Sequence, residues 1–275
     1  MTALTHESAM LSSPHSDVPA MAPAAQALPE PLTEGLLCGT VKPVRELTDS
    51  DRNAMFRLME RYFENVRAER FEADLNEKEW VTLLYEIDSS ELQGFSTLMR
   101  LEEEIDGEPV TAFFSGDTVV CRRYWRETLL PRLWGRLFFK LAEEMGGRKV
   151  YWFLICSGYK TYRFLPVFFR VFYPCHRDQC PGHIRRIMDR LASRKFPAEY
   201  DAERGVVRFR EATPLKAGVA DVTDQRLKDP HVAFFQEINP GHVHGDELVC
   251  LTEVAYDNLT PSGRRMMGLK RDTRP

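Results

Sequence analysis

The chain has 275 residues, of which 43% are hydrophobic and 28% are charged, values that are ordinary for a globular protein. No stretch approaches the roughly 18 apolar residues that a membrane span needs, and the N-terminus lacks the basic and apolar segments of a signal peptide. The six cysteines are scattered along the chain, which is typical of a reducing compartment. We therefore expect a cytoplasmic protein without a membrane span.

The formal net charge of −4 conceals an asymmetry along the chain. Residues 122–195 carry 17 Lys and Arg against 5 Asp and Glu, so the remainder holds 20 basic and 36 acidic residues. Such a basic third favours an anionic ligand or partner, unless these cations pair with acids elsewhere in the fold. No nucleic-acid-binding motif accompanies the charge, so we expect no nucleic-acid partner.

The first residues, 1–38, are rich in Ala, Pro and Ser and lack apolar periodicity. This composition predicts a disordered leader. Residues 41–47 predict a first short strand, and Asp49 or Ser50 is the expected cap of the helix that follows. A second helix is expected from Asn76 onwards.

The middle of the chain alternates between strand and helix patterns. Two β-rich runs, residues 94–103 and 110–120, flank an Asp-Gly turn at Asp106, which is a strong hairpin signal. From Thr128 the apolar residues recur at helical spacing. Residues 150–155 form a short apolar run, which is typical of a strand buried on both faces.

The last part of the chain gives weaker signals. A helix interrupted at Pro166 is expected after the apolar run, and residues 184–195 predict a helix with a basic face. Residues 197–275 hold mixed strand and loop signals around an apolar strand at 247–254. Because this part has little core of its own, we expect it to be an extension that packs on the main domain, residues 39–196.

The order of elements over residues 41–174 carries a resemblance. Two helices, an antiparallel meander, a helix, a strand and a last helix together resemble the GNAT acyltransferases. The resemblance implies an α+β fold with a mixed, mostly antiparallel central sheet flanked by helices. It also implies an N-acyltransferase that moves an acyl group from a thioester donor, acyl-CoA or an acyl carrier protein, to an amine or similar small-molecule acceptor.

Two alternatives remain open beside this function. An acidic acyl carrier protein would suit the basic third as a partner. A loop that departs from the family pattern would also suit a non-catalytic module that binds an acyl thioester or a protein partner.

The donor site implied by the resemblance lies in the loop between the central strand, residues 112–121, and the helix that begins at Thr128. In the family this loop wraps the donor pyrophosphate. Here it holds three arginines, two aromatic residues and no glycine, so arginine side chains would carry more of the phosphate contact. The implied donor-binding residues are Val119, Cys121, Arg122, Arg123, Arg126, Glu127, Thr128 and Lys160.

A polar stretch interrupts the apolar central strand and suggests the reaction centre. If the strand borders a cleft, Asp117 is a candidate base or amine-binding group, with Ser115 and Thr118 as substrate-binding residues. The alternative is a β-bulge or a short turn in which Asp117 is exposed. Family members often carry a tyrosine on the last helix as general acid, and Tyr162 is the nearby candidate here.

Two histidine-containing motifs complete the candidates. His242 and His244 form a His-x-His pattern, which suggests a metal pair if it lies on a strand, or a catalytic histidine at His244 with His242 in the substrate pocket. The Cys and His residues between Cys175 and His183 resemble half of a zinc site. Since no second half exists elsewhere, we expect no metal.

Overall fold

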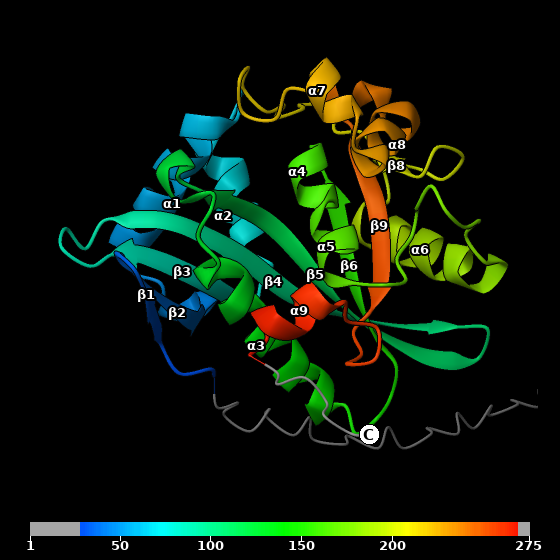
Figure 1. Ribbon diagram of the computed structural model, residues 1–275, viewed down its shortest axis with the longest axis horizontal. Helices are drawn as coiled ribbons and strands as arrows, with labels where there is room; N and C mark the ends of the chain where they lie inside the picture. Colours follow the sequence, from blue (N-terminus) through cyan, green and yellow to red (C-terminus); the bar gives the residue numbers. More distant parts are fainter. Residues whose placement is uncertain (1–27, 269–275) are drawn as a thin grey trace, which may run out of the picture.

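Strands occupy the centre of the protein and helices lie outside them (Figure 1). The computed structural model describes residues 28–268. The strands are β1 (Leu32–Glu34), β2 (Leu37–Pro43), β3 (Trp80–Glu86), β4 (Leu92–Ile105), β5 (Glu108–Val120), β6 (Val150–Cys156), β7 (Tyr200–Asp201), β8 (Val206–Val207) and β9 (Glu247–Glu253). The α-helices are α1 (Asp49–Tyr62), α2 (Ala68–Asn76), α3 (Leu129–Glu144), α4 (Tyr159–Tyr162), α5 (Phe164–Phe168), α6 (Gly182–Lys195), α7 (Asp224–Leu227), α8 (Pro230–Ile238) and α9 (Pro261–Met266). Short 3-10 helices are η1 (Val44–Glu46), η2 (Arg122–Tyr124) and η3 (Pro240–His244).

The described strands form one sheet in the order β1-β2-β3-β4-β5-β6-β9-β8-β7. Strands β5 and β6 pair in parallel, whereas the other neighbours in this sheet pair antiparallel. The predicted α+β fold with a mixed, mostly antiparallel sheet is therefore confirmed.

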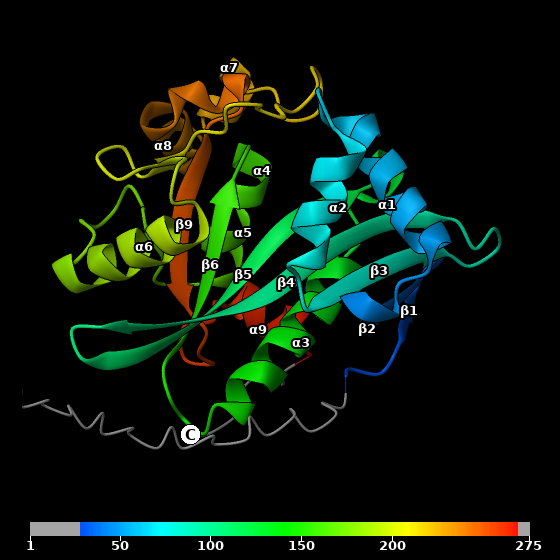
Figure 2. The same ribbon diagram turned by 180° about the vertical axis from the view of Figure 1, so that it is seen from behind.

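Helices cover both faces of the sheet (Figure 2). Successive residues of a strand point to opposite faces, so Phe113 packs in the core under α3, whereas Phe114 packs in the core under α6. Helices α3, α5 and α9 share the first face, and α1, α2 and α6 share the second. This arrangement leaves the upper end of the sheet, where β5 and β6 end, between the two layers.

Most predicted elements are present. The hairpin is β4 and β5, with Asp106 and Gly107 in the left-handed turn conformation that the Asp-Gly pair indicated. The predicted helix at Thr128 is α3, the apolar run is β6, and residues 184–195 lie in α6. The helix interrupted at Pro166 is divided into the short helices α4 and α5.

Several predictions need correction. The first predicted strand ends at Pro43 and is followed by η1, and Thr48 caps α1 in place of Asp49 or Ser50. Helix α2 ends at Asn76 instead of beginning there, and the following apolar residues form β3, because they pair with strands on both sides. Residues 32–38 of the predicted leader belong to β1 and β2, while residues 1–27 lie outside the described part. The predicted C-terminal extension contributes β9 to the sheet itself, beside β6.

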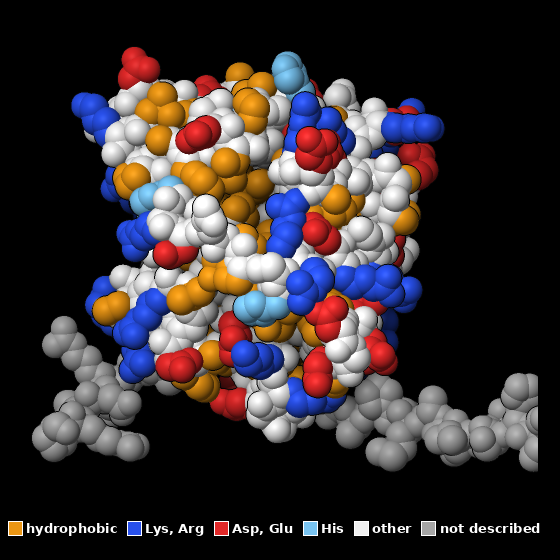
Figure 3. All heavy atoms as spheres, turned by 90° about the vertical axis from the view of Figure 1, so that its right-hand side faces the viewer, with side chains coloured by type: hydrophobic (Ala, Val, Ile, Leu, Met, Phe, Trp, Pro, Cys, Tyr) orange, Lys and Arg blue, Asp and Glu red, His pale blue; other side chains and the backbone are white. Residues whose placement is uncertain are grey.

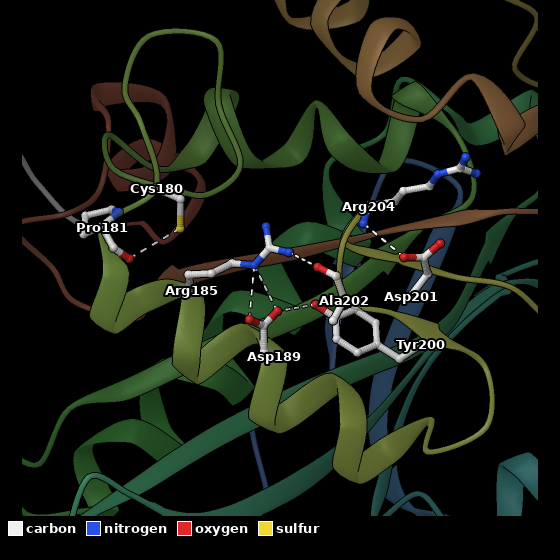
Figure 4. A network of polar contacts seen from close by, with 8 residues as sticks. All are labelled: Cys180, Pro181, Arg185, Asp189, Tyr200, Asp201, Ala202 and Arg204. Carbon is white, nitrogen blue, oxygen red and sulfur yellow. Dashed lines mark hydrogen bonds and ion pairs between the residues drawn. The ribbon is translucent and has the colours of Figure 1, made fainter.

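Helix α6 is fixed at its outer end by a polar network (Figure 4). The Arg185 guanidinium donates to the Asp189 carboxylate at 3.0 Å, and the Tyr200 hydroxyl donates to the same carboxylate at 2.5 Å. Arg185 also donates to the carbonyl of Ala202. These contacts join the first half of α6 to β7 and to the residue that follows it.

Three of the four arginines of α6 are paired with acids of the β4–β5 hairpin. Arg186 lies 2.8 Å from Asp106, and Arg190 and Arg194 both contact Glu103. On the face that forms the right-hand side of Figure 1, basic and acidic side chains are accordingly interspersed (Figure 3). This part of the basic third therefore pairs with acids within the fold. No helix among residues 28–268 is long and apolar enough to cross a membrane.

Candidate functional site

Strands β5 and β6 separate before either of them ends. Their parallel pairing stops at Ser115 and Leu154, whereas β6 continues its pairing with β9 as far as Cys156. Residues 116–120 of β5 keep β4 as a partner and pair with no strand on their other side among the described residues. The two strands therefore diverge like the arms of a V.

A cavity of about 950 Å³ opens at this divergence. Residues 116–120 of β5 line one side, and residues 157–161, which follow β6, line the other. Side chains of α1 and α2 and the segment 209–220 also border it. The cavity is large enough for a small-molecule ligand.

A β-bulge shapes the β5 side of the cavity. Gly116 and Asp117 of β5 together face the single residue Thr97 of β4. A Cβ atom on Gly116 would lie 2.6 Å from Cε of Lys78 and 2.7 Å from Oγ1 of Thr97, so a larger residue there would displace these side chains. The bulge interpretation of this stretch is thus correct, and Asp117 lines the cavity.

Two carboxyl groups border the cavity at its inner end. Burial, followed by the nearby carboxylate of Asp74, raises the pKa of Asp117 to about 7. Burial, followed by the charges of Asp117 and Asp74, raises the pKa of Glu247 to about 8. Neither Asp117 nor Glu247 makes a hydrogen bond or ion pair among the described residues. A carboxyl group with a pKa near 7 is suited to accept a proton at neutral pH.

The other end of the cavity is aromatic and cationic. Trp125 and Lys160 both line it, and the Lys160 ammonium lies 3.3 Å from the centre of the indole ring. Lys160 also donates to the carbonyl of Val219. Burial and the charges of Arg122 and Arg226 lower the pKa of Lys160 to about 8. An anion at this end would relieve the mutual repulsion of these cations.

The implied donor-binding residues are distributed unevenly. Val119, Glu127 and Lys160 line the cavity. Of the loop residues that do not line it, Arg123 is bonded to Glu86 at 2.8 Å and Arg122 lies over the Trp125 ring. The remaining implied residues outside the cavity lining are Cys121, Arg126 and Thr128.

The start of α3 is already occupied by a carboxylate. The Thr128 hydroxyl donates to Glu34 at 2.7 Å, and Arg132 donates to the same carboxylate at 3.0 Å. Glu34 comes from β1, which the sequence analysis placed in the leader. An acidic group near a helix N-terminus is stabilised by the helix dipole.

The implied catalytic tyrosine and the two histidines lie away from the cavity. The Tyr162 hydroxyl is turned into the core, where it donates to the carbonyl of Pro174 at 2.9 Å. His242 is buried against Gln236, and His244 is exposed. Both histidines belong to the 3-10 helix η3 and not to a strand.

The two implied substrate-binding residues beside Asp117 differ in whether they line the cavity. Thr118 lines the cavity and shares a hydrogen bond of 2.7 Å with Ser96. Ser115 is buried, and its oxygen accepts from the Trp152 indole at 2.8 Å. Within residues 28–268, no group of three or more His, Cys, Asp or Glu side chains could hold a metal ion.

Sequence reasoning did not propose Glu247 as a site residue. It lies at the first position of the apolar strand β9, next to Val207 in the neighbouring strand. The sequence offers one sign of such a role, which is a charged residue at the first position of a strand that is mostly buried. Its proximity to Asp117 follows only from the insertion of β9 beside β6.

No protein-family model matches the chain, and no curated protein matches it. Several solved structures match part of the chain. A conserved protein of unknown function from Enterococcus faecalis, described as a probable N-acyltransferase, is 17% identical with a TM-score of 0.38, over 50% of this chain and 33% of its own. A GCN5-related N-acetyltransferase from Kribbella flavida is 13% identical with a TM-score of 0.36, over 47% and 32%.

A GNAT family N-acetyltransferase from Escherichia coli in complex with CoA is 15% identical, with a TM-score of 0.32, over 48% of this chain and 71% of its own. The chain spans about a third of the length of the first two structures. The chain is thus similar to GNAT N-acetyltransferases, and the likeness concerns the fold.

Proposed function

We propose that the protein is an N-acyltransferase that moves an acyl group from acyl-coenzyme A to an amine in the cavity between β5 and β6. The divergence of these strands is the observation that supports the proposal. Antiparallel pairing with β4 directs alternate peptide groups of residues 116–120 away from β4. The extended amide-containing arm of coenzyme A would pair with this free edge as an added strand does.

The charge distribution favours one orientation of the donor. Lys160 and Arg226 line the end of the cavity that carries Trp125, and cations and an indole ring suit the phosphates and adenine of coenzyme A. The thioester would then lie toward Asp117. Free coenzyme A is favoured over an acyl carrier protein as the donor, because three of the four arginines of α6 already pair with the β4–β5 hairpin.

Asp117 is the proposed general base. It takes a proton from the acceptor ammonium, and the free amine attacks the thioester carbonyl carbon. The N–C bond forms, the C–S bond breaks, and the sulfur leaves with the electron pair and the second proton of the attacking nitrogen. The products are an amide and a free thiol. Peptide N–H groups of residues 116–120 would stabilise the oxyanion that develops on the carbonyl oxygen.

The predicted cytoplasmic location remains part of this proposal. All six cysteines fall within the described residues and are free, which fits a reducing compartment and a supply of intracellular acyl-coenzyme A.

The test combines binding and turnover. The full chain is titrated calorimetrically with acetyl-coenzyme A and with a longer acyl-coenzyme A, and thiol release is then followed with a panel of small primary amines. We expect donor binding, and thiol release that requires both donor and amine. Absence of binding heat and of any thermal shift with every donor would contradict the proposal. Donor binding without thiol release for any amine would instead identify a non-catalytic binding module.

A further inference from the structure

A strap runs along the cavity from its inner end to its outer end. Residues 209–220, here called the strap, run between β8 and α7 and reach across to α1 and α2 (Figures 1 and 2). The Glu64 amide donates to the carbonyl of Pro214, and the Lys216 amide donates to the carbonyl of Tyr62, both at 2.9 Å. Because several strap residues line the cavity, chain covers part of it, and the cavity suits a small molecule better than a folded protein.

Beneath the strap, two carboxyl groups lack partners. Asp117 and Glu247 come from different strands and line the same cavity without a hydrogen bond or ion pair among the described residues. Both carboxyl groups are half-buried. A charge in such a place is costly unless it is paired, so a cationic ligand that enters the cavity would complete both groups.

The cations near this pair are already engaged. Lys78 lies 2.6 Å from Asp74, and Lys195 lies 3.7 Å from Asp74 and 2.5 Å from Glu77. Arg70 donates to a strap carbonyl, and its guanidinium stacks over the Phe209 ring at 4.7 Å.

Two further arginines border this end, Arg67 at the start of α2 and Arg210 on the strap. Arg67 pairs with Glu211 at 2.9 Å. Arg210 lines the cavity from an exposed position. The inner end therefore has two carboxyl groups available for a cation, while the cations packed close to them are held by other groups.

Resting on the proposed acyl transfer, we propose that the acceptor is a small aliphatic diamine, with one amino group acylated beside Asp117 and the other held as an ammonium by Glu247. A monoamine would pair with one carboxyl group and leave the other without a partner. A diamine satisfies both, and each new ion pair in this partly buried place replaces a repulsion between like charges.

The raised pKa values of Asp117 and Glu247 support the same assignment. Burial and the neighbouring carboxylates raise the pKa of both groups, while Lys78, Lys195 and Arg70 oppose the rise at Asp117. A bound dication favours the charged form of both carboxyl groups. Diamine binding is therefore expected to release protons to the buffer at neutral pH.

The experiment compares 1,4-diaminobutane with 1-aminobutane by calorimetry on the full chain at pH 8, without an acyl donor. We expect the diamine to bind roughly tenfold or more tightly than the monoamine, as a hydrogen-bonded charge contact allows. Glu247→Gln should reduce diamine affinity to the monoamine level, while Glu69→Gln, an exposed change on α2, should leave the preference intact.

Equal affinity for the two amines, or a preference that survives Glu247→Gln, would overturn the inference. Tighter binding of an α-amino acid than of the diamine would overturn it too, since that would assign the arginines to a substrate carboxylate. The wild-type comparison needs no variant, so the inference stays testable if a variant fails to fold.

Binding and turnover separate this inference from the proposed function. Glu247-dependent diamine binding without thiol release from acyl-coenzyme A would support the diamine site and contradict acyl transfer. Thiol release that is equally efficient with monoamine and diamine would support acyl transfer and contradict the diamine site.

Discussion

The two ends of the cavity offer opposite chemistry within one cleft. At the outer end, Trp125 is 37% exposed and lies against Lys160, with Arg226 nearby. At the inner end, Asp117 and Glu247 are half-buried and carry raised pKa values. One end is therefore suited to an anion and the other to a cation.

The backbone and the side chains therefore contribute different properties to ligand binding in this cavity. The divergence of β5 and β6 gives a free strand edge, and such an edge binds any extended amide. Charged side chains at the two ends decide which molecule lies in which direction. Each prediction below changes one end and asks whether the other end is affected.

The largest effect is expected from Asp117→Asn. The amide keeps the shape of the carboxyl group but cannot accept the acceptor proton, so the rate should fall by about 10²–10⁴-fold. In the wild type, the rate should rise with pH and level off above about pH 7, because the base acts in its deprotonated form. Steady-state thiol release across the pH range measures both effects.

Two controls accompany this variant. Donor affinity should remain unchanged, because the donor phosphates are expected at the other end of the cavity. Asp88→Asn, on an exposed turn, should leave the rate as it is. An Asp117→Asn protein that keeps its pH dependence and most of its rate would assign the proton transfer to another group.

The sequence predicted the hairpin that carries this site well. The Asp-Gly turn fixed the register of β4 and β5, and the polar residues at Gly116 and Asp117 marked the bulge. These features depend on neighbours within a hairpin, where local chemistry decides the structure. The same stretch left two positions open for Asp117, a cleft and an exposed bulge or turn.

The partners of Asp117 were not predictable in the same way. Glu247 reaches the site because β9 inserts beside β6, a pairing between segments far apart in the chain. Tyr162 was the nearby tyrosine of the last helix, but core packing turns its hydroxyl to Pro174. Arg123 was favoured by its charge, but Glu86 of another strand pairs with it. Long-range packing decides each of these cases, and a single sequence does not record it.

A smaller effect is expected from Trp125→Ala at the outer end. Loss of the indole removes a stacking surface and the ring that lies under the Lys160 ammonium, so the dissociation constant for acyl-coenzyme A should rise roughly tenfold. Trp125→Phe keeps an aromatic face and should retain most of the affinity. Calorimetric titration gives both values, and an unchanged affinity in the alanine variant would move the donor away from this end.

The smallest effect concerns stability and needs no substrate. The pKa of Glu247 is raised from the usual 4.5 to about 8 in the folded protein, so the folded state holds a proton that the unfolded state releases. This contribution to stability is fully present below about pH 4.5 and is lost as the pH rises toward 8. Glu247→Gln removes that dependence.

The variant and the wild type should therefore melt at similar temperatures in mild acid. At pH 8.5 the variant should melt a few degrees higher, since about 1 kcal/mol shifts the melting temperature of a protein of this size by roughly 2–4 °C. Trp125→Phe serves as the control, because a change at the outer end leaves this titration in place. Parallel melting curves for the variant and the wild type across the pH range would show that Glu247 ionises as freely as a surface glutamate, and the contrast between the two ends would then rest on Asp117 alone.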